Sequence, residues 1–176
     1  MDNQKASLKK IATNYGLILA LASIFLQVIS FVTNNHIDQP WWISVLGILI
    51  SVVIIVYALK AFKKDNSGFL SLSEALKVGL SVSVISALVY MVYFYLFATV
   101  IEPEFISQSI EFRNQQMIEQ NPTMTAEQIE QASKFQEMFA KPWIFSAFIL
   151  IGSLFFGFII SLISGLIMKQ NRPEGY

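Results

Sequence analysis

The residues of this chain that are able to do chemistry are few, and most lie in one acidic stretch. Between Glu102 and Pro142 there are seven glutamates and only three cations, while the single histidine, His36, lies far upstream. Glutamate and histidine are metal ligands, but these glutamates have neither the alternating spacing of a calcium loop nor a paired histidine. We therefore predict that they form solvated helix faces, that the chain has no metal site, and that His36 is an exposed loop residue without a partner.

Signatures of catalysis and of cofactor binding are missing from the sequence. There is no cysteine, no serine in a nucleophile elbow and no glycine-rich phosphate loop. The formal net charge of zero is also unlike that of a strongly basic nucleic-acid-binding protein. We expect a protein that is not an enzyme, needs no cofactor and does not bind nucleic acid.

One uncharged polar group, Gln27, lies deep inside an apolar stretch. Hydroxyl groups occur at comparable positions in the apolar stretches at Ser23, Ser30, Tyr90, Tyr93 and Tyr95. These groups have two interpretations: they line a small polar pocket, or they form hydrogen bonds between neighbouring helices. We favour the second, because no ionisable residue accompanies them to mark an ion or proton pathway.

Membrane-spanning helices must position these residues, because the composition does not suit a water-soluble fold. Hydrophobic residues make up 55% of the 176 residues and charged residues 14%, against roughly 25% charged residues in typical globular proteins. A bilayer core needs about 20 apolar residues in a helix, and residues 11–33, 41–59, 78–101 and 143–168 meet this requirement. We predict an all-α fold, a bundle of four transmembrane helices that forms one membrane domain over residues 1–176.

The cations are distributed unequally between the two sides of these spans. Nine of the twelve flank the termini or lie between the second and third spans: Lys5, Lys9, Lys10, Lys60, Lys63, Lys64, Lys77, Lys169 and Arg172. Lysine and arginine in short loops stay in the cytoplasm, so both termini are predicted to be cytoplasmic. Trp41, Trp42 and Trp143 then lie at the outer ends of spans, where indole rings suit the headgroup layer.

The segment 102–142 is predicted to lie outside the membrane and to form a helical hairpin. Pro103 suits the first turn of a helix that runs to about Gln120, and Thr125 with Gln128 has the spacing of a capping box for a second helix. Both helices have an apolar face. These faces either pack against each other or lie on the membrane surface.

Small residues at helical spacing predict where the spans pack closely. The third span has Gly79, Ser83 and Ala87, and the fourth has Ser153, Gly157, Ser161 and Gly165. The first span has Ala12, Gly16 and Ala20, and the second has the pair Gly47 and Ser51. Small residues allow helix backbones to approach in lipid. We interpret them as packing seams within the chain, the alternative being a face for a second copy or another protein.

The inner loop carries signals for a turn and for the start of a helix. Asp65-Asn66-Ser67-Gly68 is a turn cluster in which the glycine suits a positive φ. Ser71 and Glu74 have the spacing of a capping box. The third helix is therefore predicted to begin on the cytoplasmic side, before it enters the lipid.

Several of these elements resemble a known family. The pattern Asn66-Ser-Gly-Phe-Leu-Ser71, then Glu74-Ala-Leu-Lys-Val-Gly79, Ile101-Glu-Pro-Glu-Phe105 and Ala140-Lys-Pro-Trp143, resembles bacterial four-helix membrane proteins catalogued as a domain of unknown function. The resemblance covers nearly the whole chain. It implies a bacterial inner membrane with the hairpin in the periplasm, but it supplies no activity and no site residue.

Two functions remain once catalysis, cofactor binding and nucleic-acid binding are excluded. We favour a non-catalytic accessory, assembly or scaffold component that acts through its outer helical loop. The alternative is a small-solute transporter or channel subunit, with Gln27 as its intramembrane polar site. Membrane lipid is an expected partner in both cases, together with another membrane or periplasmic protein or a second copy of the chain.

Overall fold

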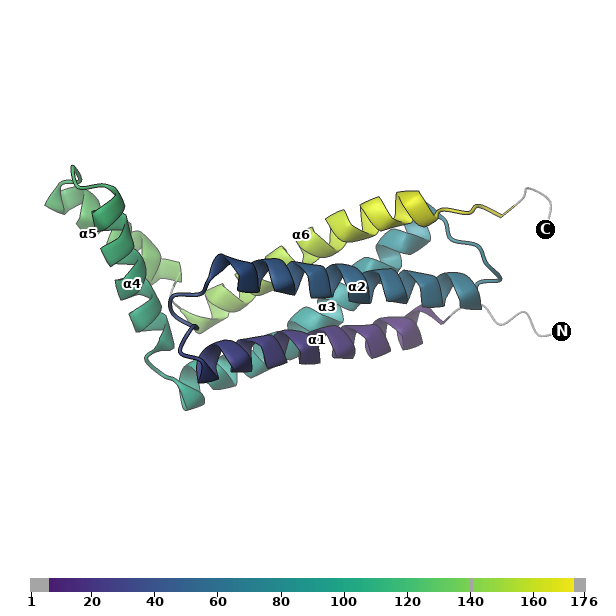
Figure 1. The fold of residues 1–176 in the computed structure, drawn as a ribbon, viewed down its shortest axis with the longest axis horizontal. Helices are drawn as coiled ribbons and strands as arrows, with labels where there is room; N and C mark the ends of the chain where they lie inside the picture. Colours follow the sequence, from purple (N-terminus) through teal and green to yellow (C-terminus); the bar gives the residue numbers. More distant parts are fainter. Residues whose placement is uncertain (1–6, 140, 173–176) are drawn as a thin grey trace.

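The computed structural model describes residues 7–139 and 141–172, and these residues form α-helices joined by short loops. Four long helices run side by side along the molecule (Figure 1): α1 (Leu8–Val32), α2 (Trp41–Asp65), α3 (Leu72–Leu96) and α6 (Pro142–Met168). A helix of 25 residues is about 38 Å long, which exceeds the roughly 30 Å of a bilayer core. The prediction of an all-α fold with four apolar spans is confirmed, and the chain is a multi-pass membrane protein.

The helices extend beyond the apolar runs that predicted them. Helix α2 continues to Asp65 rather than ending near residue 59, and α3 begins at Leu72 rather than near residue 78. A capping box sets the start of α3: Ser71 accepts a hydrogen bond from the Glu74 amide, and Glu74 accepts one from the Ser71 amide, as predicted. Beyond Leu96 the third span continues as a π-helical turn, Phe97–Ile101. The predicted positions Lys5 and Ala140 lie outside the described residues.

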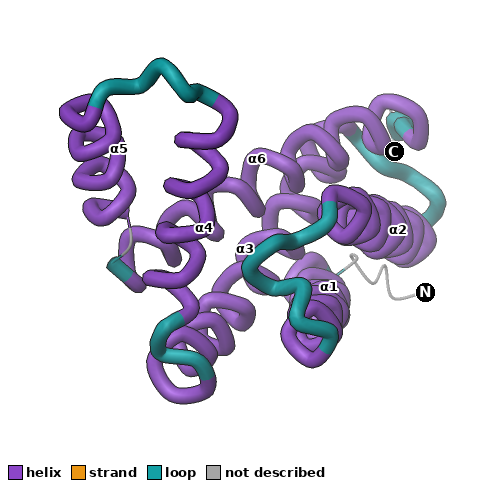
Figure 2. The backbone as a smooth tube through the Cα atoms, turned by 60° about the vertical axis from the view of Figure 1, so that its left-hand side comes forward, coloured by secondary structure: helices purple, strands orange, loops and turns teal. Residues whose placement is uncertain are grey.

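The bundle has two distinct ends. Helix α1 begins and α6 ends at one of them, here named the terminal end (Figure 1). At the opposite end, named the hairpin end, α4 (Phe105–Gln120) and α5 (Ala126–Phe139) form an antiparallel hairpin that projects beyond the spans (Figure 2). The capping box predicted for its second helix is present, since the Gln128 amide donates to Thr125 Oγ1 at 3.3 Å.

The first hairpin helix begins later than predicted. Helix α4 starts at Phe105, so Pro103 lies in the preceding turn and not in the first helical turn. The Glu102 amide donates to the Phe97 carbonyl of the π-helical turn, and the Phe105 amide donates to the Glu102 carbonyl. The chain changes direction sharply here, because α4 leaves at a steep angle to α3 (Figure 1), and a proline without an amide hydrogen fits the middle of that turn.

Helix α3 is the centre of the bundle and packs most extensively against α6 and α1. Two of its predicted small positions meet two of those in α6. A methyl group added at Gly79 would overlap the Ser161 hydroxyl, and one added at Gly157 would overlap the Ser83 hydroxyl. Each close approach thus places a glycine of one helix against a serine of the other. Because the glycine has no side chain and the serine has a small one, the backbones of α3 and α6 can approach closely along this seam.

Candidate functional site

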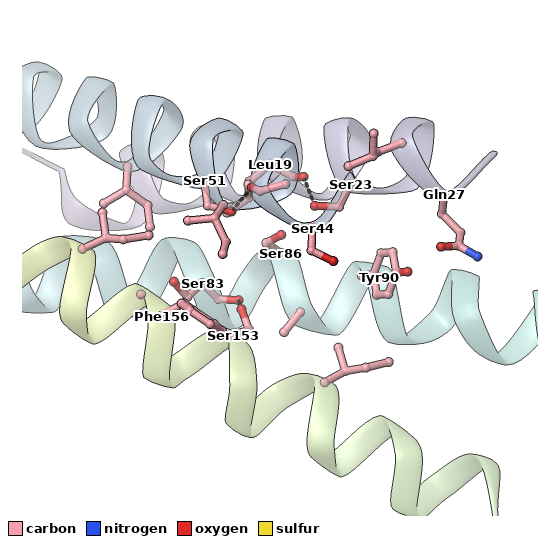
Figure 3. A pocket seen from close by; sticks show the side chains of 18 of the residues that line it. Leu19, Ser23, Gln27, Ser44, Ser51, Ser83, Ser86, Tyr90, Ser153 and Phe156 are labelled. Atoms are coloured by element: carbon pink, nitrogen blue, oxygen red, sulfur yellow. Dashed lines mark hydrogen bonds between the residues drawn. The ribbon is translucent and has the colours of Figure 1, made fainter. Parts of the chain in front are cut away.

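A crevice with a volume of about 450 Å³ lies between the four spans in the half of the bundle nearer the hairpin (Figure 3). One wall is made by α1 and α2 and the other by α3 and α6. Its polar lining residues are Ser23, Gln27, Gln39, Ser44, Ser51, Ser83, Ser86, Tyr90 and Ser153. The rest of the lining is glycine, alanine, leucine, isoleucine and phenylalanine. The volume lies within the range of small-molecule sites, roughly 300–1,000 Å³.

The crevice exists because the bundle is packed unevenly along its length. In α2, the buried residues Ile55, Ala58, Leu59 and Phe62 all lie toward the terminal end, and only Ile43 is buried in the other half. Helix α6 follows the same pattern, with Ile160 and Ser161 buried toward the terminal end. Helix α6 then diverges from α2 toward the hairpin end (Figure 3). The close seam therefore closes the crevice toward the terminal end, and the divergence opens it toward the hairpin end.

Some of the hydroxyl groups in the crevice are already bonded to backbone carbonyls. Ser23 donates to the Leu19 carbonyl and Ser51 to the Gly47 carbonyl, both at 2.9 Å within their own helices. The Ser153 hydroxyl donates to the Ser83 carbonyl at 3.1 Å and so links α6 to α3. These hydroxyl groups keep their lone pairs as acceptors.

Other polar groups of the crevice are not bonded to any described residue. They are the carboxamide of Gln27, the hydroxyls of Ser44 and Ser86, and the phenol of Tyr90, all of which point into the space between the walls (Figure 3). A carboxamide brings two donors and two acceptors, and each hydroxyl one donor. Polar groups without partners cost free energy in an apolar environment. The crevice is therefore built to hold water or a ligand that forms hydrogen bonds.

The lining limits the chemistry that the crevice can perform. Among its residues, Tyr90 is the only one with a titratable side chain. A phenol is a weak acid near neutral pH, so the site has no strong general base and no opposite charge for an ion. In the described part of the chain no three histidine, aspartate or glutamate side chains come close enough to hold a metal. The arrangement suits the binding of an uncharged molecule.

The predicted polar residues divide between this crevice and other places. Gln27, Ser23 and Tyr90 come together in it, so the pocket interpretation, which we did not favour, describes them better than hydrogen bonds between helices. Ser30 is buried elsewhere, and Tyr95 is 56% exposed.

The expected seam at Gly47 and Ser51 lines the crevice instead: a Cβ at Gly47 would lie 3.6 Å from Leu26 of α1, but no described atom of α3 or α6 lies within 4 Å of it. Ser86 was not predicted, although its spacing from Ser83 and Tyr90 places all three on one helical face.

A second group of polar residues joins two segments at the hairpin end. His36, in the loop between α1 and α2, has Nε2 at 3.0 Å from both carboxylate oxygens of Glu102. The imidazole also lies against the rings of Phe31 and Phe105. The side chains of His36 and Glu102 are only 9% and 18% exposed. The prediction of an exposed histidine without a partner is wrong, because the fold brings together residues that are 66 positions apart.

A third polar group lies at the terminal end and fixes the chain after α6. The buried Asn66 donates to the Phe69 carbonyl at 3.0 Å and to Glu74 at 3.3 Å, and it accepts a hydrogen bond from Arg172 at 2.7 Å. Leu70 and Gln170 exchange two backbone hydrogen bonds, each of 2.9 Å. The predicted turn is present, with Gly68 at a φ of 86°. These bonds tie the loop between α2 and α3 to the segment that follows α6.

A smaller cavity of about 280 Å³ lies inside the hairpin region, between α4, α5 and the start of α6. Its lining includes the apolar residues Phe105, Ile106, Ile110 and Phe145 and the polar residues Ser109, Arg113 and Gln136. The predicted apolar faces of the two hairpin helices thus partly face each other. Ile118 and Phe135 are nevertheless 43% and 59% exposed, so the hairpin also presents apolar surface to its surroundings.

Four apolar spans, a crevice between them without a charged lining residue, and a helical hairpin define a multi-pass membrane protein with a cavity between its spans. The chain belongs to the family described as protein of unknown function (DUF4199), whose model matches residues 14–170. This match confirms the family resemblance predicted from the sequence, and it includes all four spans apart from the first residues of α1. The comparison with curated proteins and the comparison with solved structures each found no match.

Proposed function

We propose that this protein binds a small uncharged molecule in the crevice between its spans. The observation that carries the proposal is the set of unbonded polar groups on Gln27, Ser86 and Tyr90, which face one cavity from α1 and α3. In a bilayer such groups need a partner, since lipid chains supply none. Without a counter-charge in the lining, a charged ligand would lose its hydration and gain little in return.

The distribution of cations supports an orientation for this site. Of the eleven lysines and arginines among the described residues, eight lie in the half of the bundle toward the terminal end or in the loop and tail there, and such residues favour the cytoplasmic side. The hairpin end and the open end of the crevice then face away from the cytoplasm, which in a bacterial inner membrane is the periplasm. A binding crevice that opens on this side fits a non-catalytic receptor, or a solute carrier whose site is open to the side away from the cytoplasm.

The absence of cysteine from the chain allows a direct test. Ser86→Cys places a thiol against the crevice, where the serine is 5% exposed, whereas Ser161→Cys places one in the closed seam, where the serine is 0% exposed and does not line the crevice. In membrane vesicles, the small uncharged reagent N-ethylmaleimide should modify the crevice thiol at least about tenfold faster than the seam thiol. Equal and slow modification of both variants would show that no accessible cavity exists and would overturn the proposal.

The ligand itself is sought on the purified protein. Small molecules extracted from wild-type protein in mild detergent are identified by mass spectrometry and compared with those from Tyr90→Phe and Gln27→Leu. Tyr95→Phe is the matched control, because this tyrosine is on the same helix but outside the crevice. A molecule retained by wild type and by the control but reduced in the two crevice variants identifies the ligand class.

A second candidate function, as an accessory or scaffold component, is favoured by the hairpin. No described residue of α4 is buried, and apolar side chains such as Ile118 remain exposed on it. Deletion of residues 103–141 followed by co-purification tests this role. Loss of a near-stoichiometric companion protein on deletion would support it, and an unchanged set of companions would contradict it.

A further inference from the structure

The crevice has an open long edge between α2 and α6. Its opposite edge is closed, since α1 packs extensively on α3, whereas α2 makes few contacts with α6. Ile48 of α2 and Phe156 of α6 both line the crevice, yet they are 41% and 46% exposed. They form the two rims of an opening on the side of the bundle.

This opening lies at the depth of the lipid chains. Ile48 follows Trp41 by seven residues and Phe156 follows Trp143 by thirteen, which at 1.5 Å per residue places the rims roughly 10 and 20 Å along their helices. Trp41 and Trp143 are 77% and 70% exposed at the hairpin end, as is typical of tryptophans in the headgroup layer. The rims therefore border the hydrocarbon region and not the aqueous phase.

The lining of the crevice matches a molecule with two different parts. Gln27, Ser86 and Tyr90 offer hydrogen bonds to a polar head. Leu19, Ile149 and Ile160 offer apolar surface, and the opening leads into the acyl chains. No lysine or arginine lines the crevice to pair with a phosphate or carboxylate, and an unpaired charge at this depth is costly.

We propose that the ligand is a neutral amphiphile of the bilayer, with an uncharged hydrogen-bonding head and an apolar tail, and that it enters sideways between α2 and α6. This inference rests on the proposed binding function and names its ligand class. The head lies against Gln27 and Tyr90, and the tail leaves over Ile48 and Phe156 into the membrane. Phospholipids and fatty acids in their charged forms are excluded from the crevice by their head groups.

The test uses the full chain in nanodiscs with two photoreactive probes that have the same tails. One probe is a diacylglycerol, which has a neutral hydroxyl head, and the other is a phosphatidic acid, which is anionic. Crosslinked peptides are mapped by mass spectrometry. The diacylglycerol should crosslink to crevice-lining positions, and the phosphatidic acid only to the outer surface of the spans.

A pair of variants shows whether the probe passes the open edge. Ile48→Trp places a bulky ring on the rim, whereas Leu49→Trp places the same ring on the neighbouring residue, which is 56% exposed and does not line the crevice. Crevice crosslinking of the diacylglycerol should fall at least about fivefold in Ile48→Trp and stay unchanged in Leu49→Trp. Because both positions are exposed to lipid, both variants should fold.

The outcomes separate this inference from the function on which it rests. Equal crosslinking of both probes in the crevice would overturn the neutral head, and equal crosslinking of both tryptophan variants would overturn the sideways route. If the diacylglycerol labels only the outer surface while the Ser86→Cys thiol still reacts with N-ethylmaleimide, the amphiphile is wrong but the cavity stands. An unreactive Ser86→Cys thiol would overturn both proposals.

Discussion

The substitution Gly157→Ala probes the seam between α3 and α6 that closes the crevice toward the terminal end of the bundle. A Cβ atom at this position would overlap Ser83 Oγ and lie 2.8 Å from Ser83 Cβ, while ordinary contacts of a Cβ are 3.4–4 Å. The Ser83 hydroxyl could rotate to another position, but Ser83 Cβ is fixed to the backbone. The two helices would therefore have to separate by about half an ångström or more to restore an ordinary contact. Overpacking of this kind costs about 1–3 kcal/mol.

Gly152→Ala is the matched control for this experiment. It lies on the same helix, but a Cβ there would meet no atom within 4 Å. Both substitutions gain the same helix propensity, roughly 1 kcal/mol relative to glycine, so their difference isolates the seam. Gly157→Ala should therefore unfold at a melting temperature roughly 2–12 °C below that of Gly152→Ala, measured by intrinsic fluorescence in detergent.

A compensating variant tests whether the loss of stability comes from the overlap with Ser83. Ser83→Gly removes the atoms that the new methyl group would overlap but leaves the Ser83 carbonyl that accepts from Ser153. The double variant Ser83→Gly with Gly157→Ala should regain most of the loss caused by Gly157→Ala. If Gly157→Ala and Gly152→Ala melt at the same temperature, α3 and α6 do not approach as described and the reasoning is refuted.

Further predictions concern the polar groups at the two ends of the bundle. A double-mutant cycle of His36→Ala and Glu102→Ala in mixed-micelle unfolding should give a coupling of about 1 kcal/mol, and a coupling near zero would mean that the pair does not form. Asn66→Ala leaves buried partners unbonded, so it should lower the free energy of unfolding by about 1–3 kcal/mol and speed hydrogen exchange at the Leu70 amide. Unchanged exchange there would contradict the tie between the α2–α3 loop and the segment after α6. Ser71→Ala removes an N-cap and should cost about 1 kcal/mol, measured by the same unfolding assay, with Ser107→Ala in the exposed hairpin as a control that leaves bundle stability unchanged.

The features that the sequence predicted well depend on residues close together in the chain. Each span is recognised by a run of apolar residues, and the capping boxes at Ser71 and Thr125 by spacings of three residues. The positive φ of Gly68 follows from its turn cluster in the same way. Hydropathy and capping are local properties, and no knowledge of the neighbouring helices is needed to evaluate them.

The small-residue pattern lies between local and tertiary information. The sequence indicated which faces of α3 and α6 permit close approach, and Gly79 and Gly157 do meet serines of the partner helix. It did not indicate that Gly47 and Ser51 would line a cavity. The same small residue allows a neighbour to approach or leaves a space, and the crossing of the helices decides between the two.

The tertiary structure alone decided the candidate site and the contacts at the two ends. Gln27 and Tyr90 face one crevice only because α6 diverges from α2 above a closed seam. His36 meets Glu102 across 66 positions, and Asn66 meets Arg172 across 106. Such distant pairs depend on how whole helices pack, and that is a property of the complete bundle and of no single segment.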